Sequence, residues 1–163
     1  MAGPGPLSAG LLLWRNRAGG PEVLLAHPGG PFWAKRDAGA WTIPKGEVEP
    51  GEDPLATARR EFREEIGQQP AGPFLPLGEI RQKAGKRVVA WAVPGDLAVE
   101  DVHSHSITVE WPRGSGRSHT FPEIDRCAWF DLAEAKRRLN PAQSAFIDEL
   151  ARQLGLRDPK LPR

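Results

Sequence analysis

The sequence of 163 residues contains no tyrosine, one methionine and one cysteine. A single cysteine, Cys127, excludes an intramolecular disulfide bond and is typical of a protein from a reducing compartment. Because Cys127 directly precedes Ala128, Trp129 and Phe130, we expect a small core residue there and not a nucleophile. The longest hydrophobic run near the N-terminus, residues 9–14, is too short to span a bilayer. No basic signal-peptide region precedes it, so the expected location is the cytoplasm.

Neither sign of charge is in excess, since 22 Lys and Arg residues face 21 Asp and Glu residues and leave a formal net charge of +1. This balance gives no support for binding of long nucleic acid, and we expect no membrane partner. A content of 39% hydrophobic and 26% charged residues is ordinary for a soluble protein. We predict a single domain over residues 1–163, with 155–163 as a loose tail, and no feature indicates an oligomeric state.

Hydrophobic alternation and turn residues predict an α/β architecture of the α+β type. Two strands at residues 7–15 and 22–27 are expected to be joined by a turn-rich segment, and a hairpin is expected over 77–94. A strand-like stretch from Trp41 should end in a Pro44-Lys45-Gly46 turn. Further strands are predicted at 107–111 and 128–130, and helices at 131–139 and 141–154.

The most informative segment of the chain is residues 46–67, GEVEPGEDPLATARREFREEIG. Asp53 is a favourable N-cap, Pro54 suits the first helical position, and Gly67 suits a left-handed C-terminal residue. These signals predict a helix between Pro54 and Gly67. At about 100° per residue, two faces of that helix differ in character. Leu55, Ala58, Phe62 and Ile66 form the apolar face, and Glu61, Glu64 and Glu65 form the neighbouring one.

Three carboxylates on one helix face repel one another, because residues three and four apart are neighbours. One interpretation is a hard divalent cation held by Glu61, Glu64 and Glu65. The alternative is a solvated acidic face whose ion-pair partners are the arginines of the same helix. Gly46, which permits close backbone approach to a ligand, favours the cation, because its carbonyl could join the carboxylates.

The spacing of Gly46, Glu52, Arg60, Glu61, Glu64, Glu65 and Gly67 resembles the Nudix box. Seven fixed positions at fixed intervals make this pattern highly specific. Two positions depart from the family pattern, where Phe62 and Gln68 replace aliphatic residues, and both bear on packing. The resemblance implies the Nudix fold, a mixed β-sheet sandwiched between α-helices, with the box as a loop–helix–loop beside it.

The resemblance also implies a metal site for Mg²⁺ or Mn²⁺. Its oxygen ligands would come from Gly46, Glu61, Glu64 and Glu65, with Glu123 as the carboxylate from outside the box. Asp125 and Glu110 are alternatives to Glu123, which could also be an exposed loop acid. The residues expected to carry catalysis are Glu52, Arg60, Glu61, Glu64 and Glu65. Within this set Arg60 would orient a glutamate, and Glu52 would hold Arg60 or the loop.

The reaction implied is water attack on a phosphorus of a nucleoside diphosphate derivative. The stretch around Trp41 and Lys45 resembles the diadenosine tetraphosphate hydrolase branch, so a dinucleoside polyphosphate is the expected small-molecule substrate. Nucleoside triphosphates, ADP-ribose or other nucleotide sugars, and a 5′-triphosphorylated RNA end are alternatives, as is a non-catalytic nucleotide sensor. Without tyrosine, base stacking falls to other aromatic residues. The predicted substrate-binding residues are Trp33, Lys35, Lys45, Trp111, Arg113 and Arg117.

Overall fold

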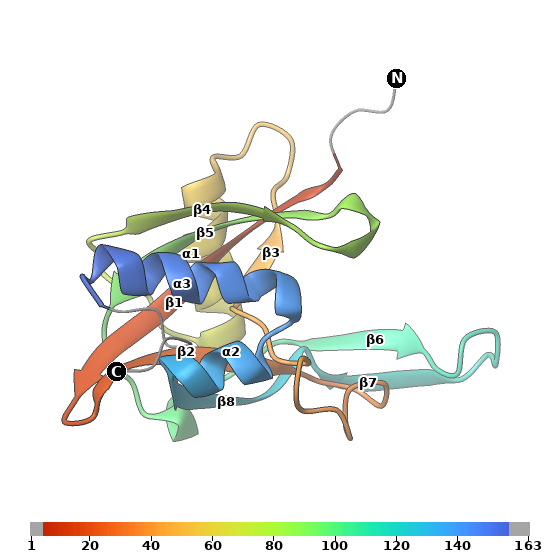
Figure 1. The fold of residues 1–163 in the computed structure, drawn as a ribbon. Coiled ribbons are helices and arrows are strands. Elements are labelled where there is room, and N and C mark those ends of the chain that lie inside the picture. Colours follow the sequence, from red (N-terminus) through yellow and green to blue (C-terminus); the bar gives the residue numbers. More distant parts are fainter. Residues whose placement is uncertain (1–4, 157–163) are drawn as a thin grey trace.

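The computed structural model describes residues 5–156 of the chain. Its strands and helices follow one another in a mixed order (Figure 1). The strands are β1 (Leu7–Arg17), β2 (Gly20–Pro28), β3 (Lys45–Glu47), β4 (Leu75–Arg81), β5 (Arg87–Pro94), β6 (Ser106–Glu110), β7 (Ser118–Pro122) and β8 (Ile124–Asp131). The helices are α1 (Pro54–Ile66), α2 (Leu132–Arg138) and α3 (Ser144–Gln153), with short 3-10 turns at Lys83–Gly85, Val99–Asp101 and Pro141–Gln143.

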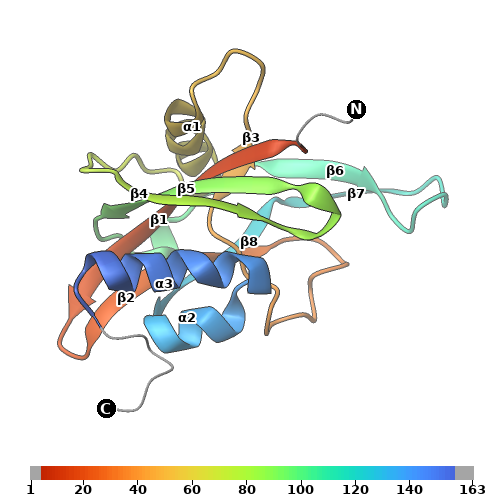
Figure 2. The same ribbon diagram turned by 45° about the horizontal axis from the view of Figure 1, so that its top comes forward.

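A six-stranded mixed sheet forms the centre of the fold, in the order β4-β5-β1-β2-β8, and β3 pairs with β1 beside this path. The β1–β5 pair is parallel, whereas β1–β2, β1–β3, β2–β8 and β4–β5 are antiparallel. Strands β6 and β7 make a separate two-stranded hairpin. In Figures 1 and 2 this hairpin projects from the body.

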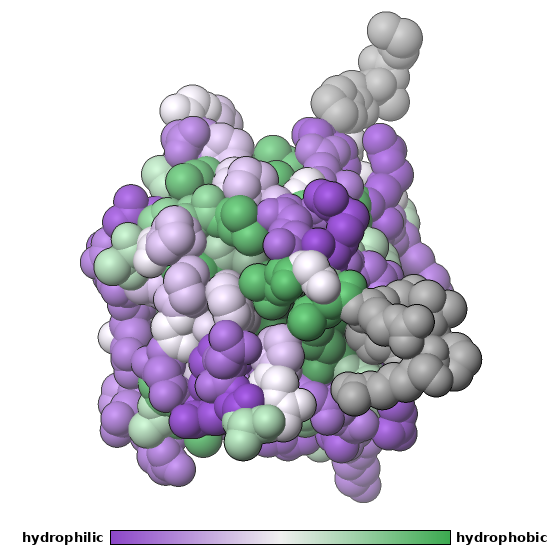
Figure 3. All heavy atoms as spheres, turned by 60° about the vertical axis from the view of Figure 1, so that its left-hand side comes forward, coloured by the Kyte–Doolittle hydropathy of each residue, from purple (hydrophilic) through white to green (hydrophobic). Residues whose placement is uncertain are grey.

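Helices cover both faces of the sheet, with α1 on one side and α2 and α3 on the other (Figure 2). Alternation along β1 supplies both layers, because successive side chains of a strand point to opposite faces. Leu12 packs with Phe146 and other buried residues of α2 and α3, whereas Leu11 and Leu13 pack with Phe62 of α1. The predicted sandwich is therefore confirmed. The face shown in Figure 3 is mostly hydrophilic, with hydrophobic residues near its centre and in its upper part.

Most predicted elements are present, with three differences. The β1–β2 connection is shorter than expected, because Arg17 still pairs with Gly20 and only two residues turn the chain. The prediction of a turn at Pro44-Lys45-Gly46 is wrong, because Lys45 and Gly46 are extended and pair with Gly10 and Ala9. Strand β7 was not predicted, because its sequence SHTFP has neither β-branched alternation nor a hydrophobic face.

The other expectations on this part of the chain hold. Cys127 is buried, as predicted, and burial raises the pKa of its thiol to about 12. No helix within residues 5–156 combines the length and hydrophobicity needed to cross a membrane. Of the tail predicted to be loose, residues 157–163 lie outside the described residues.

Candidate active site

Helix α1 is capped at both ends as its sequence predicts. The Asp53 carboxylate accepts a hydrogen bond from the Ala56 N–H at 3.0 Å, and Pro54 lies in the first turn. At the other end Gly67 is left-handed, with φ of 89°, and its N–H donates to the carbonyl of Arg63. Because the apolar face of α1 is packed on the sheet, these caps fix which residues are directed toward the neighbouring edge.

Glu65 is the most buried carboxylate of that edge, with 4% of its surface exposed. Its Oε2 accepts a hydrogen bond from the backbone N–H of Lys45 at 3.0 Å. Burial, and then the negative charges of Glu123 and Glu61, raise the pKa of Glu65 to about 9, and the Lys45 ammonium acts in the opposite direction. Residues from β3, α1 and the β7–β8 junction therefore meet around one carboxylate.

Gly46 lies directly against the carboxylate of Glu61. A Cβ atom at position 46 would stand 2.0 Å from Glu61 Cδ and 2.4 Å from both carboxylate oxygens. Only glycine fits this approach without moving the glutamate. Burial raises the pKa of Glu61, although Arg60 counteracts this effect.

Arg60 connects the acidic residues of the box. Its Nε and Nη2 groups each donate to one carboxylate oxygen of Glu52 at 3.0 Å. Its Nη1 group donates to Glu61 Oε1 at 3.0 Å and approaches Glu64 Oε2 at 3.4 Å. These contacts raise the pKa of Arg60, and the hydrogen bond from Arg60 is the largest cause that lowers the pKa of Glu52 to about 2.

The donor set suits a hard divalent cation, because carboxylate and carbonyl oxygens are the ligands that Mg²⁺ and Mn²⁺ prefer. Within residues 5–156, no three acidic, histidine or cysteine side chains converge as a ready-made metal cluster. Instead, Arg60 Nη1 lies between Glu61 and Glu64. The buried carboxyl group of Glu65 and the absence of a side chain at Gly46 are the features that fit a bound cation best.

Glu123 lies at the junction between β7 and β8, and its side chain is exposed. Its charge contributes to the raised pKa values of Glu61 and Glu65, so the junction faces the box. The two alternatives point elsewhere. Asp125 Oδ1 lies 2.9 Å from His27 Nδ1. The Glu110 carboxylate accepts a hydrogen bond from the backbone N–H of Gly114 inside the β6–β7 turn.

An aromatic cluster forms where the loop after β2 meets the β6–β7 hairpin. Phe32 contacts Trp33 with ring centroids 4.9 Å apart and Trp111 with centroids 6.1 Å apart, both edge-to-face. The Arg36 guanidinium lies 4.3 Å from the Phe32 ring centroid, and Phe32 remains 47% exposed. The structure thus brings the two predicted tryptophans together through Phe32. The sequence did not single out Phe32, although its position beside Trp33 in a Gly- and Pro-rich loop was a signal.

The three remaining predicted substrate residues are exposed, and the described part of the chain offers no polar partner to their side chains. Lys35 lies in the loop after β2, and Arg113 and Arg117 lie in the turn between β6 and β7. That turn is at the far end of the projecting hairpin (Figures 1 and 2). The structure therefore does not bring these three residues to the carboxylates, whereas Lys45 lies among them.

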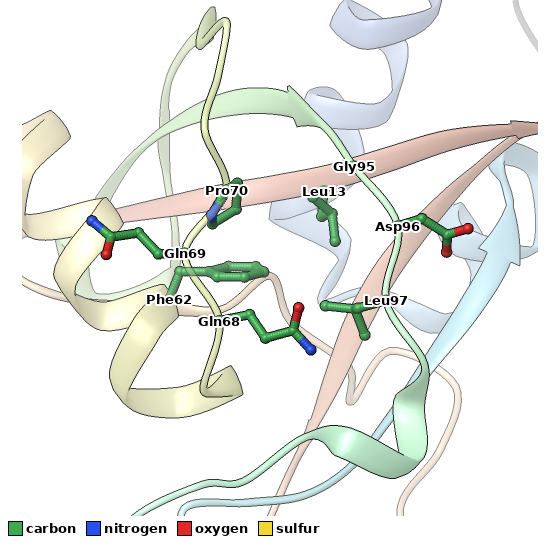
Figure 4. Close-up of a pocket in the computed structure, with 8 residues that line it drawn as sticks. All are labelled: Leu13, Phe62, Gln68, Gln69, Pro70, Gly95, Asp96 and Leu97. Carbon is green, nitrogen blue, oxygen red and sulfur yellow. The ribbon is translucent and has the colours of Figure 1, made fainter.

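A pocket of about 130 Å³ opens on another part of α1 and contains none of the predicted site residues. In Figure 4 the Phe62 ring lies between Pro70 and Gln68, and the Asp96 carboxylate points away from it. This pocket borders the packing face of α1. It is separate from the acidic edge. The lining residues are Leu13, Phe62, Gln68, Gln69, Pro70, Gly95, Asp96 and Leu97.

Comparison with known proteins gives a consistent result. The family model described as NUDIX domain matches residues 5–150. An asymmetrical bis(5′-nucleosyl)-tetraphosphatase of Sus scrofa is 46% identical over 97 residues, 58% of this chain and 58% of the relative. An RNA pyrophosphohydrolase of Rhodospirillum rubrum is 42% identical over 76 residues, 45% of this chain and 43% of the relative. The chain thus spans about half the length of the curated relatives it matches.

Among solved structures, an Ap4A hydrolase of C. elegans has a TM-score of 0.63 at 22% identity, over 92% of this chain and 98% of that chain. At this identity the likeness concerns the fold. The family model covers nearly all of the described residues and includes every residue of the acidic edge and the aromatic cluster. The chain therefore belongs to the Nudix family.

Proposed function

We propose that this protein is a divalent-metal-dependent pyrophosphohydrolase that cleaves a P–O–P link in a nucleoside diphosphate derivative, and that its substrate is a dinucleoside polyphosphate. The observation that carries this proposal is the buried Glu65, which shares one site with Glu61, Glu123 and Lys45. Burial disfavours the ionised form of Glu65, and a bound cation would stabilise that charged form. The family membership supports the reaction class.

The proposed cation is Mg²⁺ or Mn²⁺, held by the Gly46 carbonyl and by Glu61, Glu64, Glu65 and Glu123. When bound, such an ion neutralises phosphate charge, orients the substrate and lowers the pKa of an attacking water. Arg60 holds Glu61 and Glu64 in place, and Glu52 fixes Arg60 through two hydrogen bonds.

Lys45 is the proposed phosphate contact at the site. Its ammonium lies close enough to Glu61, Glu65 and Glu123 for their charges to act on its pKa, which burial lowers. A phosphate bound beside these carboxylates would therefore meet a positive charge. Lys35, Arg113 and Arg117 are proposed to contact more distant phosphates of a long polyphosphate chain.

The cluster of exposed Phe32 with half-buried Trp33 and Trp111 is the proposed platform for a nucleobase. Aromatic rings of this kind stack bases without regard to their identity. The named activity of the Sus scrofa relative supports a substrate with two nucleosides. The R. rubrum relative favours a second candidate, a triphosphorylated RNA end.

One panel experiment tests these proposals. The purified protein is incubated with Mg²⁺ or Mn²⁺ and with diadenosine tetraphosphate, nucleoside triphosphates, ADP-ribose or 5′-triphosphorylated RNA, and products are separated by chromatography. ATP and AMP from diadenosine tetraphosphate are the expected products. Preferred release of pyrophosphate from triphosphates or from RNA would overturn the substrate assignment. Equal turnover by Glu64→Gln would overturn the metal role.

Two further parts of the proposal concern the protein as a whole. The single buried cysteine is consistent with a cytoplasmic location. Residues 1–163 are proposed to form one hydrolase domain, with the family match over 5–150 as support.

A further inference from the structure

His27, at the end of β2, is fully buried and takes no part in the site as described so far. Its Nδ1 lies 2.9 Å from Asp125 Oδ1, and its Nε2 lies 2.6 Å from the carbonyl oxygen of Arg36. Each ring nitrogen of His27 therefore has a polar partner, and the two partners come from different segments of the chain. The ring also packs edge-on against Trp41, with centroids 5.2 Å apart.

The two partners of His27 belong to the two parts of the proposed site. Arg36 directly follows the turn that carries Phe32 and Trp33, and its guanidinium lies over the Phe32 ring. Asp125 follows Glu123 by two positions at the start of β8. One buried imidazole thus joins the segment that bears the aromatic platform to the segment that bears the carboxylate from outside the box.

The same two segments touch again on the other side of His27. The Gly29 N–H donates to the carbonyl of Glu123 at 2.9 Å. A Cβ at Gly29 would stand 1.9 Å from the carbonyl oxygen of Pro122, and one at Gly30 would stand 2.6 Å from the Phe121 ring. The start of the loop, at Gly29 and Gly30, therefore lies against the β7–β8 junction, and a shift of one would move the other.

From this arrangement we propose that His27 is a positioning residue that couples the aromatic platform around Phe32 to the carboxylate of Glu123. The inference rests on the proposed function, because it assigns to His27 the relative placement of the base-binding and phosphate-cleaving parts of that site. His27 itself touches neither. Its effect passes through Arg36 to the platform and through Asp125 to Glu123.

The test is a set of double-mutant cycles on diadenosine tetraphosphate hydrolysis. His27→Gln should lower kcat about ten-fold or more, the range typical of residues that orient ligands, and should raise KM as well. In a Glu123→Gln background the effect of His27→Gln on kcat should vanish, and in a Phe32→Ala background its effect on KM should vanish. Asp125→Asn, at a partly exposed position, should reproduce the kcat effect if His27→Gln folds poorly.

A readout other than activity accompanies these cycles. Hydrogen exchange in the metal-free protein should become faster in residues 28–36 and in 121–125 together for His27→Gln, and His103→Gln, at an exposed histidine, should change neither segment. Fully additive kinetic effects, or faster exchange in one segment alone, would overturn the coupling while leaving the proposed function intact. An inactive wild-type protein across the substrate panel would overturn the proposed function and the coupling with it.

Discussion

Arg60 and Glu52 form a two-pronged ion pair, in which Nε and Nη2 of the arginine each lie 3.0 Å from one carboxylate oxygen. The third nitrogen of the guanidinium remains available and donates to Glu61 at 3.0 Å. A planar fork of this kind has a fixed direction, which a lysine ammonium cannot reproduce. The pair therefore sets the direction from which Glu61 and Glu64 are held.

Arg60→Lys is expected to keep the positive charge and to lose the orientation of Glu61. Activity should fall about 10- to 100-fold, as for other residues that orient metal ligands, with an unchanged circular dichroism spectrum. Arg63→Lys is the matched control, because Arg63 is exposed on the same helix. Equal turnover by Arg60→Lys and Arg63→Lys would show that the fork has no part in catalysis.

Gly46→Ala is expected to displace the carboxylate of Glu61, since the added Cβ would lie 2.0 Å from Glu61 Cδ. Mn²⁺ binding, measured by calorimetry, should weaken, and hydrolysis should fall in parallel. Gly19→Ala serves as the control, because a Cβ at Gly19 meets nothing within 4 Å. Wild-type Mn²⁺ affinity in Gly46→Ala would contradict a site built around this glycine.

The stability of the metal-free protein should depend on the titration of Glu65. Its pKa is about 9 in the folded state, against an ordinary value of 4.5 in the unfolded chain. Between these values the folded state keeps a proton that the unfolded state releases, so the free energy of unfolding falls as pH rises. In EDTA, the melting temperature should be higher at about pH 5.5 than at about pH 8.

Glu65→Gln isolates this contribution, because it removes the titrating group and keeps an acceptor for the Lys45 N–H. The variant should show a flatter dependence of melting temperature on pH over the same range. Glu52 does not affect this comparison. Its lowered pKa of about 2 confines its contribution to the pH dependence of stability to more acidic solutions. Parallel curves for the wild type and Glu65→Gln would exclude Glu65 as the source.

Phe32→Ala is expected to weaken binding of diadenosine tetraphosphate with little change in kcat. Removal of one base-stacking ring typically costs about 1–3 kcal/mol, so KM should rise about 5- to 150-fold. Phe74→Ala is the control, because Phe74 is partly buried beside Arg59 and has no contact with the cluster. A KM ratio near one for Phe32→Ala would remove the cluster from the substrate site.

The last prediction concerns Gln143 and the stability of the fold alone. Its side chain is 1% exposed, and its Oε1 accepts the backbone N–H of Ile43 at 2.9 Å. Gln143→Leu would leave that buried N–H without a partner, at a cost of about 1–3 kcal/mol. The melting temperature should fall by several degrees, whereas Gln69→Leu, at an exposed position, should leave it unchanged. A stable Gln143→Leu would mean that Ile43 finds another acceptor.

Local signals explain why most of the fold was predictable. Asp53, Pro54 and Gly67 act within a few residues of α1, so their spacing alone defines its ends. The signal of β1 is equally local, because a strand buried on both faces reads as a continuous hydrophobic run, here residues 11–13. Strand β7 lacks such a signal, since its pairing with β6 places polar Thr120 opposite polar Thr108 on a separate hairpin.

The contacts within the site were predictable only where one segment supplies both partners. Residues of the box lie on one helix and its preceding strand, so spacing brought Gly46, Arg60 and Glu61 together. The contacts of Phe32 with Trp111 and of His27 with Asp125 join residues distant in sequence, and no periodicity connects them. In the sequence, His27 is a polar residue at the end of a predicted strand. Only the three-dimensional structure reveals its two hydrogen-bond partners.

The pairing of β2 with β8 has a consequence for how the protein would acquire the proposed activity. His27 and Asp125 are separated by 98 positions along the chain, and Ile43 and Gln143 by 100. Contacts between such distant residues form slowly, because a long loop must close before they contribute any stability. The proposed base platform around Phe32 and the Glu123 carboxylate can be set in place only when that closure occurs. A newly made chain should therefore become active in the same step that makes it resistant to unfolding.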